Sequence, residues 1–117
     1  MFEGFKVVEL ASVLAGPLVG SFFAELGAEV IKIENSTTGG DVTRKWKLPN
    51  EAQESSFSSY YAAANYGKKS IFLNIQESEG YKIAIDLIKT ADILVVNFKN
   101  GDAEKLGFDY NTLKNLN

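Results

Sequence analysis

The sequence contains no cysteine and no histidine, and among its 117 residues there is only one arginine. Without cysteine these residues have no disulfide framework and no thiol nucleophile. Without histidine they also lack the commonest general base and a frequent metal ligand. Any acid–base or nucleophilic chemistry performed by this chain therefore depends on carboxylates, hydroxyls or lysines.

An excess of positive charge is lacking too. Twelve lysine and arginine residues stand against 15 aspartates and glutamates, which gives a net charge of -3, and the basic residues are spread along the chain. A protein that binds nucleic acid normally gathers basic residues on one face. The composition therefore argues against nucleic acid as the main partner.

Long hydrophobic runs are also missing. No stretch has the roughly 20 apolar residues of a transmembrane helix, and residues 1–4 lead into a strand pattern without the apolar core of a signal peptide. We therefore expect no membrane partner and a cytoplasmic protein. With 45% hydrophobic residues, the chain can bury a core as one domain, residues 1–117.

The residues that are present alternate between strand and helix patterns. Four short runs rich in Val, Ile, Leu or Phe predict strands, and at least two are apolar nearly throughout, as in parallel sheets covered on both faces. These runs are Lys6–Leu10, Glu29–Ile33, Ser70–Ile75 and Ile93–Phe98. The intervening patterns predict helices at Pro17–Leu26, Ser59–Tyr66 and 78–91, then a short helix ended by Gly107 and a last one at Tyr110–Leu116.

This alternation predicts an α/β fold with a Rossmann-like, mostly parallel sheet flanked by helices. Ligands bind such sheets at the carboxyl ends of the strands. Because Asn117 comes where another strand would follow, we expect residues 1–117 to be the N-terminal part of a larger, incomplete domain. The segment Asn35–Ser58 has no clear periodicity, and both a functional loop and a plain surface excursion remain open for it.

A nicotinamide-dinucleotide site is one possible interpretation, since Glu34 ends the second predicted strand. The fingerprint of such sites needs three glycines at fixed spacing in the loop after the first strand. Only Gly16 and Gly20 are present, and Pro17 removes an amide donor. The loop chemistry therefore disfavours a dinucleotide.

Five segments, in this order, resemble the N-terminal portion of family III coenzyme A (CoA) transferases: LAGP, ELGAEVIKIE, GGDVTRKW, ANYGKKSIFLNIQESEG and ADILVVNFKNGDAEKLGFDYNTLKNLN. The group contains formyl-CoA transferase, carnitine CoA-transferase and α-methylacyl-CoA racemase. Each motif alone is weakly specific, but together they cover essentially the whole chain.

The resemblance implies a transferase that moves CoA from an acyl-CoA thioester to a carboxylic acid. An aspartate nucleophile forms a mixed anhydride and then an aspartyl-CoA thioester. Family members are several times longer and form interlocked homodimers, and their catalytic aspartate lies beyond the position of Asn117. None of the aspartates here occupies its place, so we assign no catalytic residue, no metal and no tightly bound cofactor to this chain.

The resemblance also implies a CoA site at the ends of the predicted strands. Its residues match Leu14, Ala15, Asn35, Leu73, Asn74, Ile75, Gln76, Asn97, Phe98, Lys99 and Lys105. Asn35 and Lys105 stand where relatives commonly have arginine. Asparagine at position 35 lacks the positive charge, and lysine at position 105 keeps the charge but cannot make the two parallel hydrogen bonds of a guanidinium. The cations that we expect to pair with the CoA phosphates are Lys68, Lys69, Lys99 and Lys105.

Two alternatives stay open on the sequence. An acyl-CoA racemase or isomerase of the same superfamily would abstract a proton with residues outside this chain. A non-catalytic nucleotide-binding module would bind a ligand without turning it over.

Overall fold

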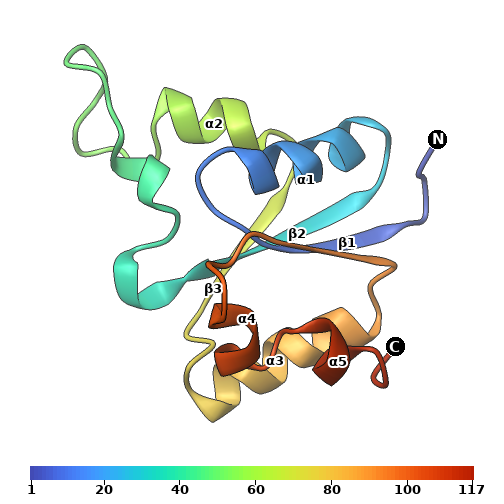
Figure 1. The fold of residues 1–117 in the computed structure, drawn as a ribbon. Helices are drawn as coiled ribbons and strands as arrows, with labels where there is room; N and C mark the ends of the chain where they lie inside the picture. The colour runs from blue at the N-terminus through green and yellow to red at the C-terminus, as the bar shows by residue number, and fades with distance from the viewer.

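The computed structural model describes all 117 residues and has one parallel sheet between two layers of helices (Figure 1). Its strands stand in the order β3-β2-β1-β4. They are β1 (Lys6–Leu10), β2 (Glu29–Asn35), β3 (Lys69–Leu73) and β4 (Ile93–Val96). The predicted α/β fold with a parallel sheet is confirmed.

The chain direction across the sheet reverses beside β1. From β1 it moves outward through β2 to β3, and it then returns to place β4 on the other side of β1. In the register, Val8 pairs with Ile31 on one side and with Leu94 on the other. The gap between the carboxyl ends of β1 and β4 is therefore a topological switch point, where open α/β sheets bind ligands.

The helices divide between the two faces of the sheet (Figure 1). One face is covered by α1 (Ala15–Glu25) and α2 (Ser59–Asn65). The other is covered by α3 (Ser78–Lys89), α4 (Asp102–Leu106) and α5 (Tyr110–Leu113). Two short 3-10 turns, η1 (Ser36–Thr38) and η2 (Val42–Lys45), follow β2.

The two faces of the sheet differ in chemistry. Side chains alternate along a strand, so Val8, Leu10 and Ile33 share the α3 face, where they pack with Ile85 and Ile88 in an apolar core. The face under α1 is apolar near the amino ends of the strands, where Val7 and Val30 lie. Toward the carboxyl ends it carries three buried charged residues, Glu9, Lys32 and Glu34.

Several element boundaries differ from those predicted. β3 runs from Lys69 only to Leu73, because β2 is its single neighbour and the last pair joins Asn35 to Leu73. β4 ends at Val96, the partner of the last residue of β1. α1 starts two residues before Pro17, which is tolerated because amides in a first turn need no helical acceptor.

No helix of the structure is both long enough and apolar enough to span a membrane.

Candidate functional site

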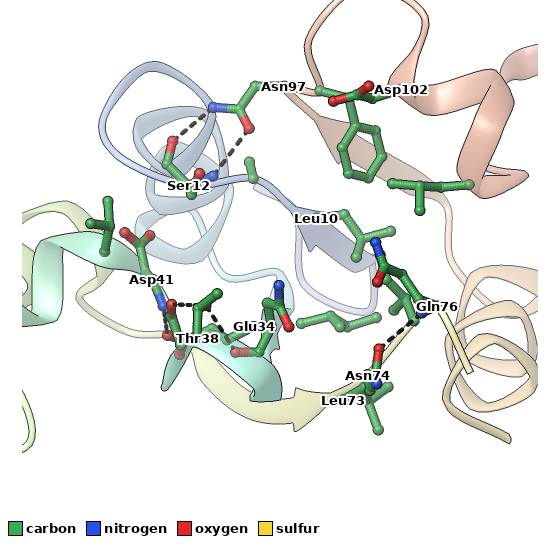
Figure 2. Close-up of a pocket in the computed structure, with 18 of the residues that line it drawn as sticks. Leu10, Ser12, Glu34, Thr38, Asp41, Leu73, Asn74, Gln76, Asn97 and Asp102 are labelled. Atoms are coloured by element: carbon green, nitrogen blue, oxygen red, sulfur yellow. Dashed lines mark hydrogen bonds between the residues drawn. The ribbon is translucent and has the colours of Figure 1, made fainter. Parts of the chain in front are cut away.

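A cavity of about 620 Å³ lies at the carboxyl edge of the sheet (Figure 2). All four strands contribute to it, through their last residues or through the loops that follow them. Its apolar lining includes Leu10, Ile33, Leu73, Ile75, Phe98 and Leu106. Its polar lining includes Ser12, Asn35, Thr38, Asp41, Lys45, Asn74, Gln76, Asn97, Lys99 and Asp102. A site with apolar walls and a few placed polar groups is typical of small-molecule binding.

Most residues that the sequence assigned to a CoA site lie together around this cavity. They come from the ends of β2, β3 and β4, and they are Asn35, Leu73, Asn74, Ile75, Gln76, Asn97, Phe98 and Lys99. Segments up to 64 residues apart in the chain thus meet at one edge, because parallel strands end at the same side of a sheet. Their contact with CoA stays a prediction.

Three predicted residues lie outside this cavity. Leu14 and Ala15 are exposed at the start of α1 and do not line it, since the helix begins there and turns away from the sheet edge. Lys105 is exposed on α4 and borders a neighbouring cavity of about 660 Å³, which shares Ile75 and Gln76 with the first.

The cations placed at the site differ from those expected. Lys68 cannot serve a phosphate, because its ammonium is buried 2.7 Å from Glu9 Oε1 and 2.9 Å from Asn65 Oδ1. Burial lowers the pKa of Lys68, while its bond to Glu9 opposes that shift. Lys69 is exposed but begins β3, at the opposite edge of the sheet.

A lysine that sequence reasoning missed borders the cavity instead. Lys45 is exposed at the end of η2 and lines the cavity with Lys99. It lay within the segment Asn35–Ser58, whose course had no periodic signal. The first part of that segment lines the cavity, whereas residues 46–58 do not; the lining residues are Asn35, Thr38, Gly40, Asp41, Val42 and Lys45.

A chain of buried ion pairs lies next to the cavity, on the α1 face of the sheet. The sequence analysis did not predict it. Lys32 Nζ lies 2.9 Å from Glu9 Oε2 and 3.0 Å from Asp41 Oδ2, and it donates to the carbonyl oxygen of Ala11 at 2.8 Å. The side chains of Glu9 and Lys32 are 0% and 1% exposed. The pairing of the two strands could have indicated this ion pair, since Glu9 and Lys32 are opposite each other in neighbouring strands.

A second buried cluster surrounds Glu34. Its carboxylate accepts hydrogen bonds from Arg44 Nη2 at 2.7 Å, from the Asp41 backbone amide at 2.7 Å and from the Tyr61 hydroxyl at 2.8 Å. The Ser70 hydroxyl donates to it as well. These bonds occupy the carboxylate, so Glu34 has no oxygen free for a ribose, which removes the acidic residue from the dinucleotide interpretation.

The surroundings of Glu34, Arg44 and Tyr61 determine which of these three side chains are charged. Burial by itself would raise the pKa of Glu34, but the bonds from Arg44, the Asp41 amide, Ser70 and Tyr61 outweigh it and lower the pKa to about 2. The pKa of Arg44 is raised by its bond to Glu34. Burial and the neighbouring carboxylate raise the pKa of Tyr61, so this phenol stays neutral. The Arg44 guanidinium also lies 3.9 Å from the centre of the Tyr61 ring.

Together the two clusters attach the segment after β2 to the sheet. Asp41 belongs to the Lys32 chain through its side chain and to Glu34 through its backbone amide. Its Oδ1 also accepts from the backbone amide and hydroxyl of Thr43, at 3.0 and 2.8 Å. One wall of the cavity is therefore fixed by buried charged contacts, not by loop packing alone.

Comparison with known proteins gives the same fold and family. The profile of CoA-transferase family III matches residues 2–117. The succinate–glutarate CoA-transferase of Agrobacterium fabrum is 44% identical over 118 residues, covering 98% of this chain and 29% of its own length. The human succinyl-CoA:glutarate CoA-transferase is 39% identical, covering 97% and 25%.

Solved structures agree. A CAIB/BAIF family protein from Brucella suis superimposes with a TM-score of 0.90 at 42% identity, over 99% of this chain and 30% of that one. The chain thus spans between a quarter and a third of the length of these relatives. The fold, the ordered motifs and the profile match over residues 2–117 together show that this chain belongs to CoA-transferase family III.

Proposed function

We propose that this chain forms the CoA-binding part of an enzyme that transfers CoA from an acyl-CoA thioester to a carboxylic acid. Family membership supports the reaction class. The observation that carries the binding role is the convergence of residues from the ends of β2, β3 and β4 on one cavity at the carboxyl edge of the sheet.

The cavity offers complementary chemistry for CoA. Lys45 and Lys99 supply positive charge for the phosphates, and Lys105 does so from the adjoining cavity. Each such exposed contact contributes about 0.2–1 kcal/mol. Phe98 packs one ring face on Phe108, with centroids 6.1 Å apart, and also lines the cavity, where it is placed to contact the adenine.

The proposed mechanism uses an aspartate outside these 117 residues. Its carboxylate attacks the thioester carbonyl, the carbon–sulfur bond breaks and the CoA thiolate leaves, which gives a mixed anhydride. The thiolate then attacks the aspartyl carbonyl and releases the donor acid, and the acceptor carboxylate reverses both steps. In this scheme the chain retains CoA while its thiolate is free, so that binding energy far from sulfur serves the transfer.

The named relatives favour transfer over racemisation, because both are CoA-transferases. Their names also support succinyl-CoA and glutarate as the first donor and acceptor to test. For the whole enzyme we propose the interlocked homodimer that the family resemblance implies.

Calorimetric titration of the 117-residue protein tests the binding role. CoA should bind, its affinity should fall as salt is raised, and NAD should bind more weakly or not at all. Selective binding of NAD, or no binding of CoA, would contradict the proposal. ATP at equal concentration serves as the comparison for a general nucleotide site.

A second assay tests the location of the catalytic aspartate. The purified 117-residue protein, mixed with succinyl-CoA and glutarate, should form no glutaryl-CoA above the rate without protein. Turnover by this chain would show that a catalytic residue lies within it, and the proposed division of labour would be wrong.

A further inference from the structure

The loop between β1 and α1 is held by side chains from other parts of the chain. At the switch point, Asn97 Oδ1 accepts from the backbone amide of Ser12 at 3.1 Å, and Asn97 Nδ2 donates to the Ser12 carbonyl oxygen at 2.7 Å (Figure 2). The two residues are 85 positions apart in sequence. One asparagine therefore satisfies both backbone groups of a residue that lines the cavity.

The neighbouring residues are held from the β2 side. Lys32 donates to the carbonyl oxygen of Ala11 at 2.8 Å, and Asp41 Oδ1 accepts from the backbone amide of Val13 at 3.4 Å. Consecutive backbone groups from Ala11 to Val13 thus have fixed partners. These partners come from the two strands that flank β1 or from the loops after them.

This attachment coincides with an unfavourable backbone conformation. Val13 has φ of 72°, and it is the only residue other than glycine with positive φ. A β-branched side chain rarely adopts this region, and such a residue persists only where its surroundings determine it. The contacts of Ser12 with Asn97 immediately precede the strained residue, so they are placed to hold it.

We propose that Asn97 is a positioning residue, which holds Ser12 at the wall of the CoA cavity together with the strained Val13 that follows it, and does not bind CoA through its side chain. Each polar atom of its amide already bonds the Ser12 backbone, and these two bonds together fix the orientation of the amide. This inference rests on the proposed CoA-binding role and differs from the direct contact that the sequence resemblance implied for Asn97.

The strain at Val13 gives a test that separates positioning from contact. Replacing Asn97 by Ala removes the attachment, so that CoA binding must itself restore the strained conformation of Val13. We expect CoA affinity to fall about tenfold, which is the lower end of the cost of such backbone strain. Replacing Val13 by Gly removes the cost of positive φ. The double variant Asn97→Ala/Val13→Gly should therefore recover most of the lost affinity. A direct contact would not be restored by glycine at position 13.

The measurements are calorimetric titrations of CoA into the wild type, the two single variants, the double variant and a control variant, and amide hydrogen exchange in the absence of ligand. Asn97→Ala should speed exchange at Ser12, while Asn111→Ala, at an exposed asparagine of α5, should change neither exchange nor affinity. Loss of affinity without recovery by Val13→Gly would overturn the inference, and so would unchanged affinity and exchange in Asn97→Ala.

Failure of the proposed function would look different. In that case the wild-type chain would not bind CoA at all, while exchange at Ser12 would still respond to Asn97→Ala as expected. The ligand-free measurement therefore judges the attachment of the loop independently of CoA.

Discussion

The buried carboxylate of Glu34 makes the free energy of unfolding of this protein fall at acidic pH. Its pKa is lowered from 4.5 to about 2 in the fold, which corresponds to about 3 kcal/mol of unfolding free energy. Because the folded pKa lies below the unfolded one, this contribution is fully present above pH 4.5. It is lost as the pH falls from 4.5 to 2, because within this range the unfolded state binds nearly one more proton than the folded state.

Replacing Glu34 by Gln removes the charge while keeping the size of the side chain. It leaves the guanidinium of Arg44, 14% exposed, without its counterion. We expect the variant to be less stable by about 3 kcal/mol at pH 7, a large part of the total for a domain of this size. The difference should shrink below about 1 kcal/mol near pH 2, because half of the wild-type carboxyl is then protonated in the folded state.

Urea unfolding at a series of pH values, followed by the fluorescence of Trp46, measures both quantities. Between pH 4 and 2.5 the wild type should lose about 1.2 kcal/mol per pH unit more than Glu34→Gln, close to the limit for one proton. Glu54→Gln, at an exposed glutamate, is the matched control and should follow the wild-type curve. Parallel curves for the wild type and Glu34→Gln would refute the argument from the buried cluster.

Three further changes test other contacts. Gly80→Ala places a methyl group against the carbonyl oxygen of Asn74, and should lower the unfolding free energy by about 1–3 kcal/mol in urea melts; unchanged stability would show that α3 can shift. Lys32→Met strands the buried charge of Asp41 and should cost about 3–5 kcal/mol by the same assay, whereas a small loss would mean that water reaches the carboxylate. Lys45→Ala should weaken CoA binding about two- to fivefold in calorimetry, with the difference vanishing at high salt, and equal affinities would remove Lys45 from the site.

The fold was predictable because its elements are short and strongly patterned. The alternation of apolar strand runs with helices determined the α/β class, and the turn and cap residues located most helix ends. Gly107, for example, was expected to end the short helix before the last one, and it is the residue that follows the end of α4. Strand ends were less predictable, because β3 and β4 stop where their neighbours stop and not where their own apolar runs stop.

The site was predictable in position but not in its supporting charges. Parallel strands end at the same side of the sheet, so Asn35 and Asn97 line one cavity. The residues around either asparagine in the sequence do not indicate that the two lie close together. Lys68 shows the limit of local reasoning. Together with Lys69 it was expected to pair with a phosphate, yet its ammonium is buried against Glu9, a partner 59 residues away, and against the Pro17 carbonyl of α1. Only the folded structure distinguishes these two lysines, by burying the side chain of Lys68 and exposing that of Lys69.

The buried charges raise a question of energetics that bears on the site. Burying ions is costly, and well-packed apolar groups in their place are often as stable, so stability alone does not account for the Glu9, Lys32 and Asp41 chain. The same side chains, however, bond backbone groups at the cavity edge, including the Ala11 carbonyl and the Val13 amide. Those groups lie where the sheet ends, and each needs a partner once water is excluded. Covering them with more chain would fill the space that a ligand requires, whereas the charged side chains of Lys32 in β2 and Asp41 in the following segment satisfy them and leave the cavity open.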